Sequence, residues 1–258
     1  MRDNRKRGSM TLPPRPSNSP RRSSSALVIR DNPLEVLMIA RHAEQDFASA
    51  LVFPGGLVDP ADAGDDWLAH VAGAEDLSRD ERALRIAACR ETFEECGLLL
   101  ARRRDGSAIA EAIDPDGDLK DVLAQHDAVL CLDALVHFGH WITPEVAPRR
   151  YDTHFYLIDA PEGQVARCDG QEAIEAIWVE PAATLSAAAA GTRKVLFPTR
   201  MNLSLLSRTG DAASALADAR ERPVATVLPR VEKRENGVAV VIPESAGYGQ
   251  TEYLYPGG

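Results

Sequence analysis

Residues 90–100 read RETFEECGLLL and end a segment in which both ends of a helix are marked. Ser78 and Glu81 have the spacing of a capping box, in which the two side chains bind backbone N–H groups of the first turn. Gly97 stands where a helix ends, because glycine adopts the left-handed conformation without a Cβ clash. The segment between these signals therefore predicts one long helix. Its apolar stripe toward a core is formed by Ile86, Cys89, Phe93 and Cys96.

Three glutamates share one flank of this predicted helix. At about 100° per residue, Glu91, Glu94 and Glu95 fall within an arc of about 100°. Carboxylates this close repel each other, and the nearest cation is Arg90, four residues before Glu94. A hard divalent cation prefers oxygen ligands and would offset the repulsion. The alternative is a solvated acidic face that binds nothing.

The motif around these glutamates is similar to that of a known family. Residues 90–98, RETFEECGL, resemble the second half of the Nudix box, and Phe53-Pro54-Gly55-Gly56 resembles its start. The resemblance spans roughly residues 26–207. It implies an α/β (α+β) fold, a Nudix-like α/β/α sandwich with a mixed sheet and a helix that bears the catalytic glutamates.

The same resemblance implies a metal-dependent hydrolase of pyrophosphate bonds. Mg²⁺ or Mn²⁺ would be the cofactor, with Glu91, Glu94 and Glu95 as its ligands and Arg90 orienting the carboxylates. The general base would be Glu91, Glu94 or Glu172, the last in a loop ahead of a predicted strand; a plain exposed glutamate is the alternative for Glu172.

The box is interrupted, since residues 57–89 separate Gly56 from Arg90. A Nudix subgroup similar to the peroxisomal-type coenzyme A diphosphatases carries an insertion at this point, and we expect one at about 61–78. Residues 141–157, WITPEVAPRRYDTHFYL, also resemble that subgroup. The resemblance implies coenzyme A or an acyl-CoA as substrate. The subgroup's Leu-Leu-Thr run before the glycines is missing, so ADP-ribose, a dinucleotide or a modified nucleotide stays the alternative.

Because of the insertion, the sequence does not fix which residue is the first acidic residue of the box. Asp62 lies six residues after Gly56, as the box requires, although glutamate is usual there. We expect either a role at the metal, direct or through another residue, or a turn residue near Pro60. Counting back from Arg90 instead reaches Arg82 beside Glu81, and the helix cap accounts for Glu81.

Further candidates for substrate binding lie outside the motif. The backbone of Gly55 and Gly56 would approach the substrate. Arg149 and Arg150 could bind a phosphate while Tyr151 stacks on a base, or they could be a surface pair. Arg41, at the end of a predicted strand, is a candidate for phosphate contact. Packing or surface roles are expected for three histidines, His137, His140 and His154.

The remaining pattern indicates alternating strands and helices. A hairpin is expected from SALVIR (25–30) and LEVLMIAR (34–41), followed by an apolar run at ALVFPGG (50–56). Further strands are expected in the ranges 128–141, 151–159, 173–181, 224–229 and 237–243, and helices in 181–191 and 199–208. One domain would span 26–258, with a C-terminal extension from about 210.

Charge divides the 258 residues unevenly. The formal net charge is −10, but residues 1–25 carry +6, so the remainder carries −16. The remainder is too acidic for a general nucleic-acid surface, and no nucleic acid is expected as a partner. Residues 1–25 are rich in Pro, Ser and Arg, which predicts a disordered basic tail. RNA binding through this tail is the alternative.

Cysteine usage and hydropathy bear on the compartment. The four cysteines form no CxxC pair, which favours reduced thiols, a cytoplasmic protein and no zinc site. No apolar run approaches the ~18 residues that span a bilayer, and the chain ends in YPGG, which is not a peroxisomal address. The partner is then a small molecule; the oligomeric state stays open, a homodimer included. A non-catalytic nucleotide-binding module is the competing class, but such modules tend to lose the glutamates.

Overall fold

The structure, a computed structural model, describes the chain except for residues 1–17, 42–49, 110–112, 114–115, 169–172 and 257–258. In the described residues a mixed sheet of nine strands runs through the centre, in the order β11-β3-β2-β1-β9-β8-β12, while β10 pairs with β2 and β4 with β1. Its strands are β1 (Arg21–Arg30), β2 (Glu35–Arg41), β3 (Ala50–Val52), β4 (Gly55–Leu57), β8 (Val136–Ile142), β9 (Tyr151–Asp159), β10 (Ala173–Val179), β11 (Lys194–Val195) and β12 (Thr226–Val227).

Strand β1 organises this sheet. It forms the predicted hairpin with β2 and pairs in parallel with β9, from Arg21 opposite Tyr151 to Ile29 opposite Asp159. The strand therefore begins at Arg21, inside the segment 1–25 expected to be a disordered tail, and that boundary is corrected. The reason is that strand pairing and the burial of Ser24 hold the polar run in place. Residues 1–17 lie outside the described part.

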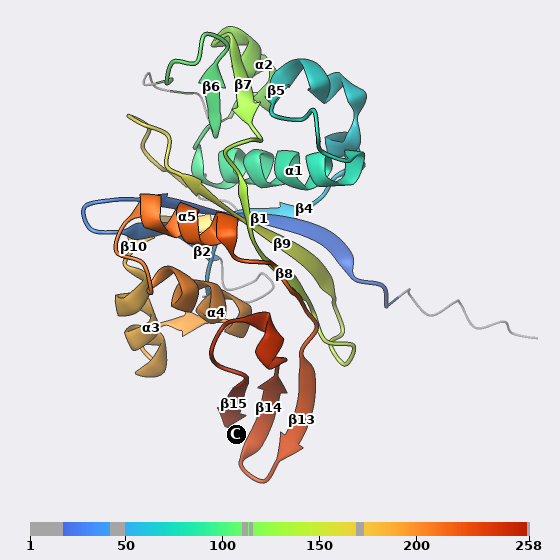
Figure 1. Cartoon of the computed structure of the whole chain (residues 1–258), viewed down its shortest axis with the longest axis vertical. Helices are drawn as coiled ribbons and strands as arrows, with labels where there is room; N and C mark the ends of the chain where they lie inside the picture. The colour runs from blue at the N-terminus through green and yellow to red at the C-terminus, as the bar shows by residue number, and fades with distance from the viewer. Residues whose placement is uncertain (1–17, 42–49, 110–112, 114–115, 169–172, 257–258) are drawn as a thin grey trace, which may run out of the picture.

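Two apolar layers cover the two faces of the sheet, because successive side chains of a strand point to opposite faces. Ala26 and Val28 of β1 pack with α1 (Arg79–Cys96), whereas Leu27 and Ile29 pack on the other face. That other face is covered by α3 (Pro181–Ala189), α4 (Phe197–Leu206) and α5 (Ala212–Glu221). Figure 1 shows α1 on one side of the sheet and α3 and α4 on the other. The predicted α/β/α sandwich is confirmed.

A smaller layer lies beyond α1. Strands β5 (Val71–Ala72), β6 (Ala101–Arg103) and β7 (Ala128–Cys131) form a sheet in the order β5-β7-β6, next to α2 (Leu119–Gln125). The predicted insertion folds into two 3-10 helices, η1 (Pro60–Ala63) and η2 (Asp65–His70). Trp67 anchors it, since the side chain is buried and its Nε1–H donates to the Ala61 carbonyl at 3.1 Å.

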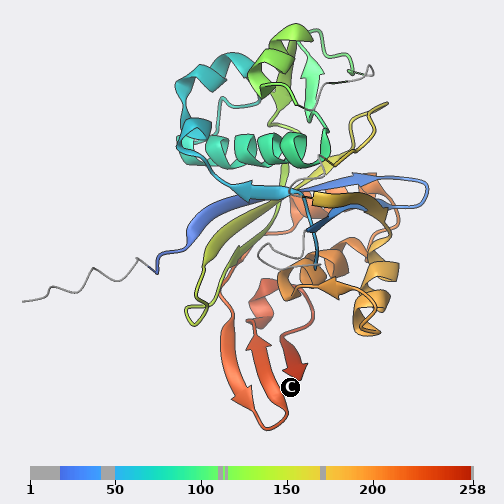
Figure 2. The same cartoon turned by 180° about the vertical axis from the view of Figure 1, so that it is seen from behind.

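The C-terminal part adds a third sheet. Strands β13 (Arg230–Arg234), β14 (Gly237–Val241) and β15 (Glu252–Pro256) pair in antiparallel fashion, and η3 (Glu244–Ala246) lies between β14 and β15. Figure 2 shows this sheet extending from the body at the end away from α1. Tyr248 ties it to the core, because its hydroxyl accepts from Trp141 Nε1–H at 2.8 Å and donates to Asn202 at 3.1 Å.

Among the residues that the structure describes, no helix combines the length and apolarity needed to cross a bilayer.

Candidate active site

The glutamate helix α1 has the ends that the sequence predicts. Ser78 Oγ accepts from the Glu81 N–H, the Glu81 carboxylate accepts from the Ser78 N–H at 3.0 Å, and Gly97 has a φ of 65°. The N–H of Gly97 donates to the Phe93 carbonyl at 2.8 Å and so closes the last turn. Phe93 is buried in the core, so the opposite flank of this last part of the helix faces β4 and the cleft described below.

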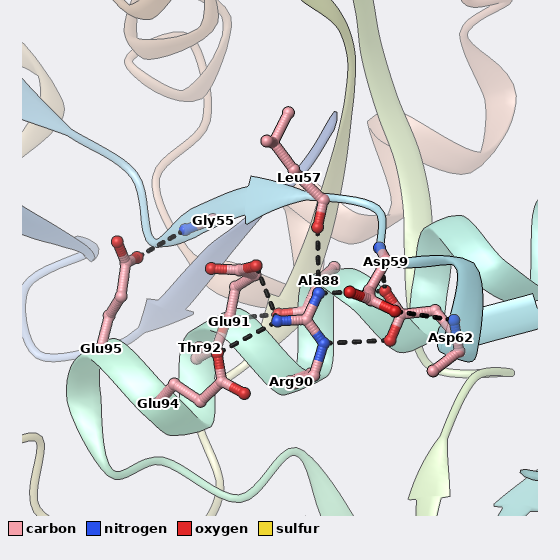
Figure 3. A network of polar contacts seen from close by, with 11 residues as sticks. Gly55, Leu57, Asp59, Asp62, Ala88, Arg90, Glu91, Thr92, Glu94 and Glu95 are labelled. Carbon is pink, nitrogen blue, oxygen red and sulfur yellow. Dashed lines mark hydrogen bonds and ion pairs between the residues drawn. The ribbon is translucent and has the colours of Figure 1, made fainter. Parts of the chain in front are cut away.

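Arg90 is the centre of the polar network on that flank (Figure 3). Its Nη1 donates to Glu91 Oε1 at 2.7 Å and to Glu94 Oε2 at 3.0 Å. Its Nη2 donates to the Leu57 carbonyl of β4 at 2.9 Å. The predicted role of Arg90, orienting the carboxylates, agrees with these contacts.

Asp62 holds Arg90 from the other side. Its two carboxylate oxygens accept from Nε and Nη2 of Arg90, each at 3.0 Å, and the side chain is buried. Oδ2 also accepts from the Asp59 N–H at 2.8 Å, which completes a capping box at η1. The insertion thus supplies a positioning residue for Arg90, one of the two roles expected for Asp62.

Glu95 and the glycines form the junction between α1 and β4. Glu95 Oε2 accepts from the Gly55 N–H at 2.7 Å, and both residues are buried. Gly55 has a φ of 153°, and a Cβ there would lie 2.3 Å from the Ser24 carbonyl oxygen. A Cβ on Gly56 would lie 2.3 Å from a carboxylate oxygen of Glu91. Gly55 requires glycine because its Cβ would meet backbone atoms, whereas at Gly56 the carboxylate of Glu91 occupies the space.

The electrostatics of the network show too little positive charge for its carboxylates. Burial raises the pKa of Glu91, Arg90 opposes this rise, and the carboxylates of Glu94 and Asp62 add to it. Burial alone would lower the pKa of Arg90, but Asp62 and Glu91 hold it above its usual range. Arg90 thus only partly offsets the effect of burial and of the neighbouring carboxylates on Glu91.

A cleft of about 990 Å³ opens over these carboxylates. Glu91, Glu94 and Glu95 line it together with Gly55 and Gly56. The other walls are largely apolar and come from segments far apart in the sequence. They include Trp141, Leu196, Phe197, Pro198, Val240 and Tyr255.

Comparison with known proteins places this arrangement in a family. The family model described as NUDT19 Nudix domain matches residues 72–198. The crystal structure of a NUDIX hydrolase from Alicyclobacillus acidocaldarius is 29% identical, with a TM-score of 0.70 over 80% of this chain and 100% of that chain. The chain belongs to the Nudix hydrolase family.

Curated relatives point to one branch of the Nudix family. Putative nudix hydrolase 7 from Caenorhabditis elegans is 29% identical, over 76% of this chain and 63% of its own length. Acyl-coenzyme A diphosphatase NUDT19 from Gallus gallus is 31% identical, over 62% of this chain and 57% of its own length. The Homo sapiens protein of the same name is 31% identical, over 57% and 53%. The chain thus spans little more than half the length of these relatives.

The metal that the Nudix fold implies can be tested against the residues present. The glutamates offer only oxygen donors, which a hard cation such as Mg²⁺ prefers. Glu95 is buried and Glu94 is half exposed at 52%, so the donors reach from the protein interior to the cleft. The raised pKa of Glu91 indicates a buried carboxylate that a cation would stabilise. The residues therefore fit a divalent metal ion.

The other predicted residues of this Nudix chain separate into three groups. Arg149 and Tyr151 line the cleft. Arg150 is not among the residues that line the cleft, and its guanidinium donates to the carbonyls of Thr143 and Asn18, each at 3.0 Å. Its expected phosphate contact is therefore replaced by a structural role in the loop before β9. Arg41 ends β2, with only its backbone described, and Glu172 lies outside the described residues.

Several cleft residues of this Nudix chain carry no signal in the sequence. Trp141, Phe197 and Tyr255 read as ordinary core or strand residues, and the tertiary fold alone brings them to one cleft. The three histidines, for which packing or surface roles are expected, lie together in one cluster in which their rings stack.

Proposed function

We propose that this chain is a metal-dependent diphosphatase that hydrolyses a pyrophosphate bond in a nucleoside-diphosphate-linked substrate, coenzyme A or an acyl-CoA foremost. The observation that carries the proposal is the set of three α1 glutamates in the wall of a cleft large enough for such a molecule. Retention of all three argues against a non-catalytic nucleotide-binding module.

The residues of the chain divide the chemistry among them. Glu91, Glu94 and Glu95 would hold Mg²⁺ or Mn²⁺, which when bound neutralises phosphate oxygens and lowers the pKa of water. Arg90 and Asp62 keep Glu91 and Glu94 in place, so that little reorganisation is needed at the reaction. A carboxylate not committed to the metal accepts the proton from water; Glu91, Glu94 and Glu172 are the candidates.

The substrate class rests on the walls of the cleft. The phosphoanhydride would lie against the glutamates, while Arg149 contributes positive charge and Tyr151 an aromatic ring. The apolar wall from Trp141 and Phe197 suits a long, partly apolar arm rather than a second sugar. The acyl-coenzyme A diphosphatases among the relatives support the same class. ADP-ribose or a dinucleotide is the alternative substrate.

A screen of phosphoanhydrides with Mg²⁺ and with Mn²⁺ tests the proposal. We expect coenzyme A or an acyl-CoA to be cleaved into two phosphate-bearing halves, and Glu94→Gln or Glu95→Gln to lower kcat by about 100-fold or more. The matched control is Glu162→Gln, an exposed glutamate outside the cleft. Cleavage of ADP-ribose with coenzyme A inert would move the substrate to the alternative. Absence of any turnover would contradict the hydrolase itself.

The proposed location is the cytoplasm. All four cysteines are thiols in the described structure, which suits a reducing compartment.

A further inference from the structure

Strands β8 and β9 gather three potential metal ligands on the side of the sheet away from the cleft. Thr153 and Tyr151 of β9 line the cleft, so Asp152 and His154 point to the opposite face. His140 of β8 lies directly across from His154 in the strand register. One potential ligand atom from each of His140, Asp152 and His154 lies within 4.8 Å of the other two.

The two imidazoles are packed in an unusual way for histidines. The rings of His140 and His154 stack with their centroids 3.9 Å apart and an interplanar angle of 20°. His137 stacks on His154 in turn, at 5.1 Å. Parallel imidazoles at these distances would repel each other if both were protonated, and the neutral imidazole is the form that binds a metal.

Hydrogen bonds orient each ring as the neighbours of metal-bound histidines do. His140 Nδ1 lies 2.8 Å from Thr226 Oγ1, and His140 Nε2 lies 2.5 Å from Asp152 Oδ1. His154 Nδ1 lies 3.1 Å from His137 Nε2. Nδ1 of each ring is thus engaged by a neighbouring side chain, which leaves Nε2 as the metal-binding atom. A metal ion bound between these donors would replace the hydrogen bond between His140 Nε2 and Asp152.

Charged groups of both signs lie around the cluster. Burial lowers the pKa of His154 to about 4, and the neighbouring histidines and Arg22 contribute. Burial also lowers the pKa of His137 to about 4, with His140 and Arg85 lowering it further and Glu81 opposing them. Arg22 is paired with Asp80 at 3.0 Å. Asp152 is the carboxyl group that directly faces the two imidazoles.

We propose that His140, Asp152 and His154 form a second metal site, selective for a borderline divalent transition ion such as Zn²⁺. Two imidazoles and one carboxylate suit Zn²⁺, whereas Mg²⁺ prefers oxygen ligands alone. The three donors would draw together to separations of roughly 3.4 Å, as tetrahedral Zn²⁺ requires, with a water molecule as the fourth ligand. The ion would join β8 to β9, and through Thr226 it would support β12, behind the wall of the cleft.

Calorimetry on the intact, metal-stripped protein tests this site. Zn²⁺ is the probe, and millimolar Mg²⁺ is present throughout to saturate oxygen-only sites. We expect one Zn²⁺ per chain with a micromolar or lower Kd, release of protons on binding, and a rise in Tm of roughly 5 °C or more at a hundredfold excess over Kd. Absence of Zn²⁺ binding at micromolar concentrations would overturn the proposal.

Variants assign the binding to these residues. His154→Gln and Asp152→Asn should each weaken Zn²⁺ binding by about 100-fold, whereas His70→Gln, outside the cluster, should leave it unchanged. Glu94→Gln should also leave it unchanged, because Glu94 belongs to the cleft on the other side. Undiminished binding in His154→Gln, or loss of binding in Glu94→Gln, would contradict the assignment.

A measurement on the wild-type protein keeps the test valid if a variant fails to fold. Diethylpyrocarbonate modifies neutral imidazoles, and mass spectrometry locates the modified residues. Zn²⁺ should protect His140 and His154 at least several-fold and leave His70 unprotected. Equal modification of His154 with and without saturating Zn²⁺ would overturn the site.

Discussion

Gly56 sets how closely β4 approaches the glutamates of α1. A methyl group at this position would lie 2.3 Å from a carboxylate oxygen of Glu91, which can swing away, whereas the backbone need not move. We therefore expect Gly56→Ala to lower kcat by about 10-fold or more with a loss of stability below about 1 kcal/mol. Steady-state kinetics and urea unfolding measure the two effects. Gly210→Ala, where no atom lies within 4 Å, is the matched control and should change neither.

Asp62 links the segment of the expected insertion to the glutamates through Arg90. Asp62→Asn retains the shape of the side chain but removes the charge that faces Arg90 from inside the protein. We expect the free energy of unfolding to fall by about 2 kcal/mol, since hydrogen bonds between charged, buried groups are lost. Activity should fall too, because Arg90 no longer fixes Glu91 and Glu94.

A matched substitution separates burial from charge in that prediction. Asp127 also faces an arginine, Arg104 at 3.4 Å, but it is 79% exposed. Asp127→Asn should change stability by no more than about 0.5 kcal/mol in the same urea titration. Equal losses of stability from the two substitutions would mean that burial adds nothing to the strength of the Asp62–Arg90 pair.

The N-terminus of α1 is a prediction at the scale of the element. Ser78→Ala removes the hydroxyl that accepts from the Glu81 N–H, and we expect a loss of about 1 kcal/mol in urea unfolding. Ser186→Ala is the control, because Ser186 lies inside α3, is exposed and bonds only to the Ala182 carbonyl. Alanine there should be neutral or slightly stabilising. A loss of equal size at Ser186 would remove the cap as the cause.

The capping box also gives the Ser78→Ala effect a pH dependence. The hydrogen bond from the Ser78 hydroxyl lowers the pKa of Glu81 below its usual value of 4.5, and the backbone N–H of Ser78 lowers it further. Because the folded-state pKa lies below the unfolded-state value, this stabilisation is present above about pH 4.5 and is lost as the pH falls through the folded-state pKa. The difference between wild type and Ser78→Ala should therefore shrink in acid, as urea titrations over this pH range can measure.

Elements with local signals were predictable from the sequence, and elements without them were not. The capping box, the final glycine and the apolar stripe identify α1, and the strand expected at 151–159 is β9. In contrast, α2 is only seven residues long and β5 has two residues, so their pattern is too short to predict an element. They form because distant segments pair or pack with them, and a single sequence does not reveal those contacts.

The same distinction holds for the site. The glutamates and Arg90 form a contiguous motif on one helix, so their proximity follows from helix geometry. The pairing of Asp62 with Arg90 crosses 28 positions, and the contact of Glu95 with Gly55 crosses 40. His140 and Asp152 are close only because β8 and β9 pair in one register. Tertiary structure, and not local pattern, determines these contacts.

For the whole molecule, β9 separates two sets of potential metal ligands. Tyr151 and Thr153 face the cleft, whereas Asp152 and His154 face the side of α1. Ser23 Oγ of β1 lies 2.6 Å from Thr153 Oγ1, so the two strands are joined at the same level by side chains as well as by the parallel ladder. The two sets of ligands therefore lie on either side of a strand that is held on both edges.

The C-terminal sheet extends this architecture to the cleft and yields a prediction for substrate choice. Tyr255 of β15 lines the cleft, while its neighbour Leu254 is equally exposed but does not. We expect Tyr255→Ala to raise KM for a long-chain acyl-CoA by about 10-fold with little change in kcat, because the ring would contact the substrate's arm and not the reacting phosphates. Leu254→Ala should alter neither constant. Steady-state kinetics over a series of acyl lengths measures the effect, which should be smallest for ADP-ribose, since that molecule lacks the arm. A loss of kcat of equal size for every substrate would instead mean that β15 holds the glutamate helix and its cleft together.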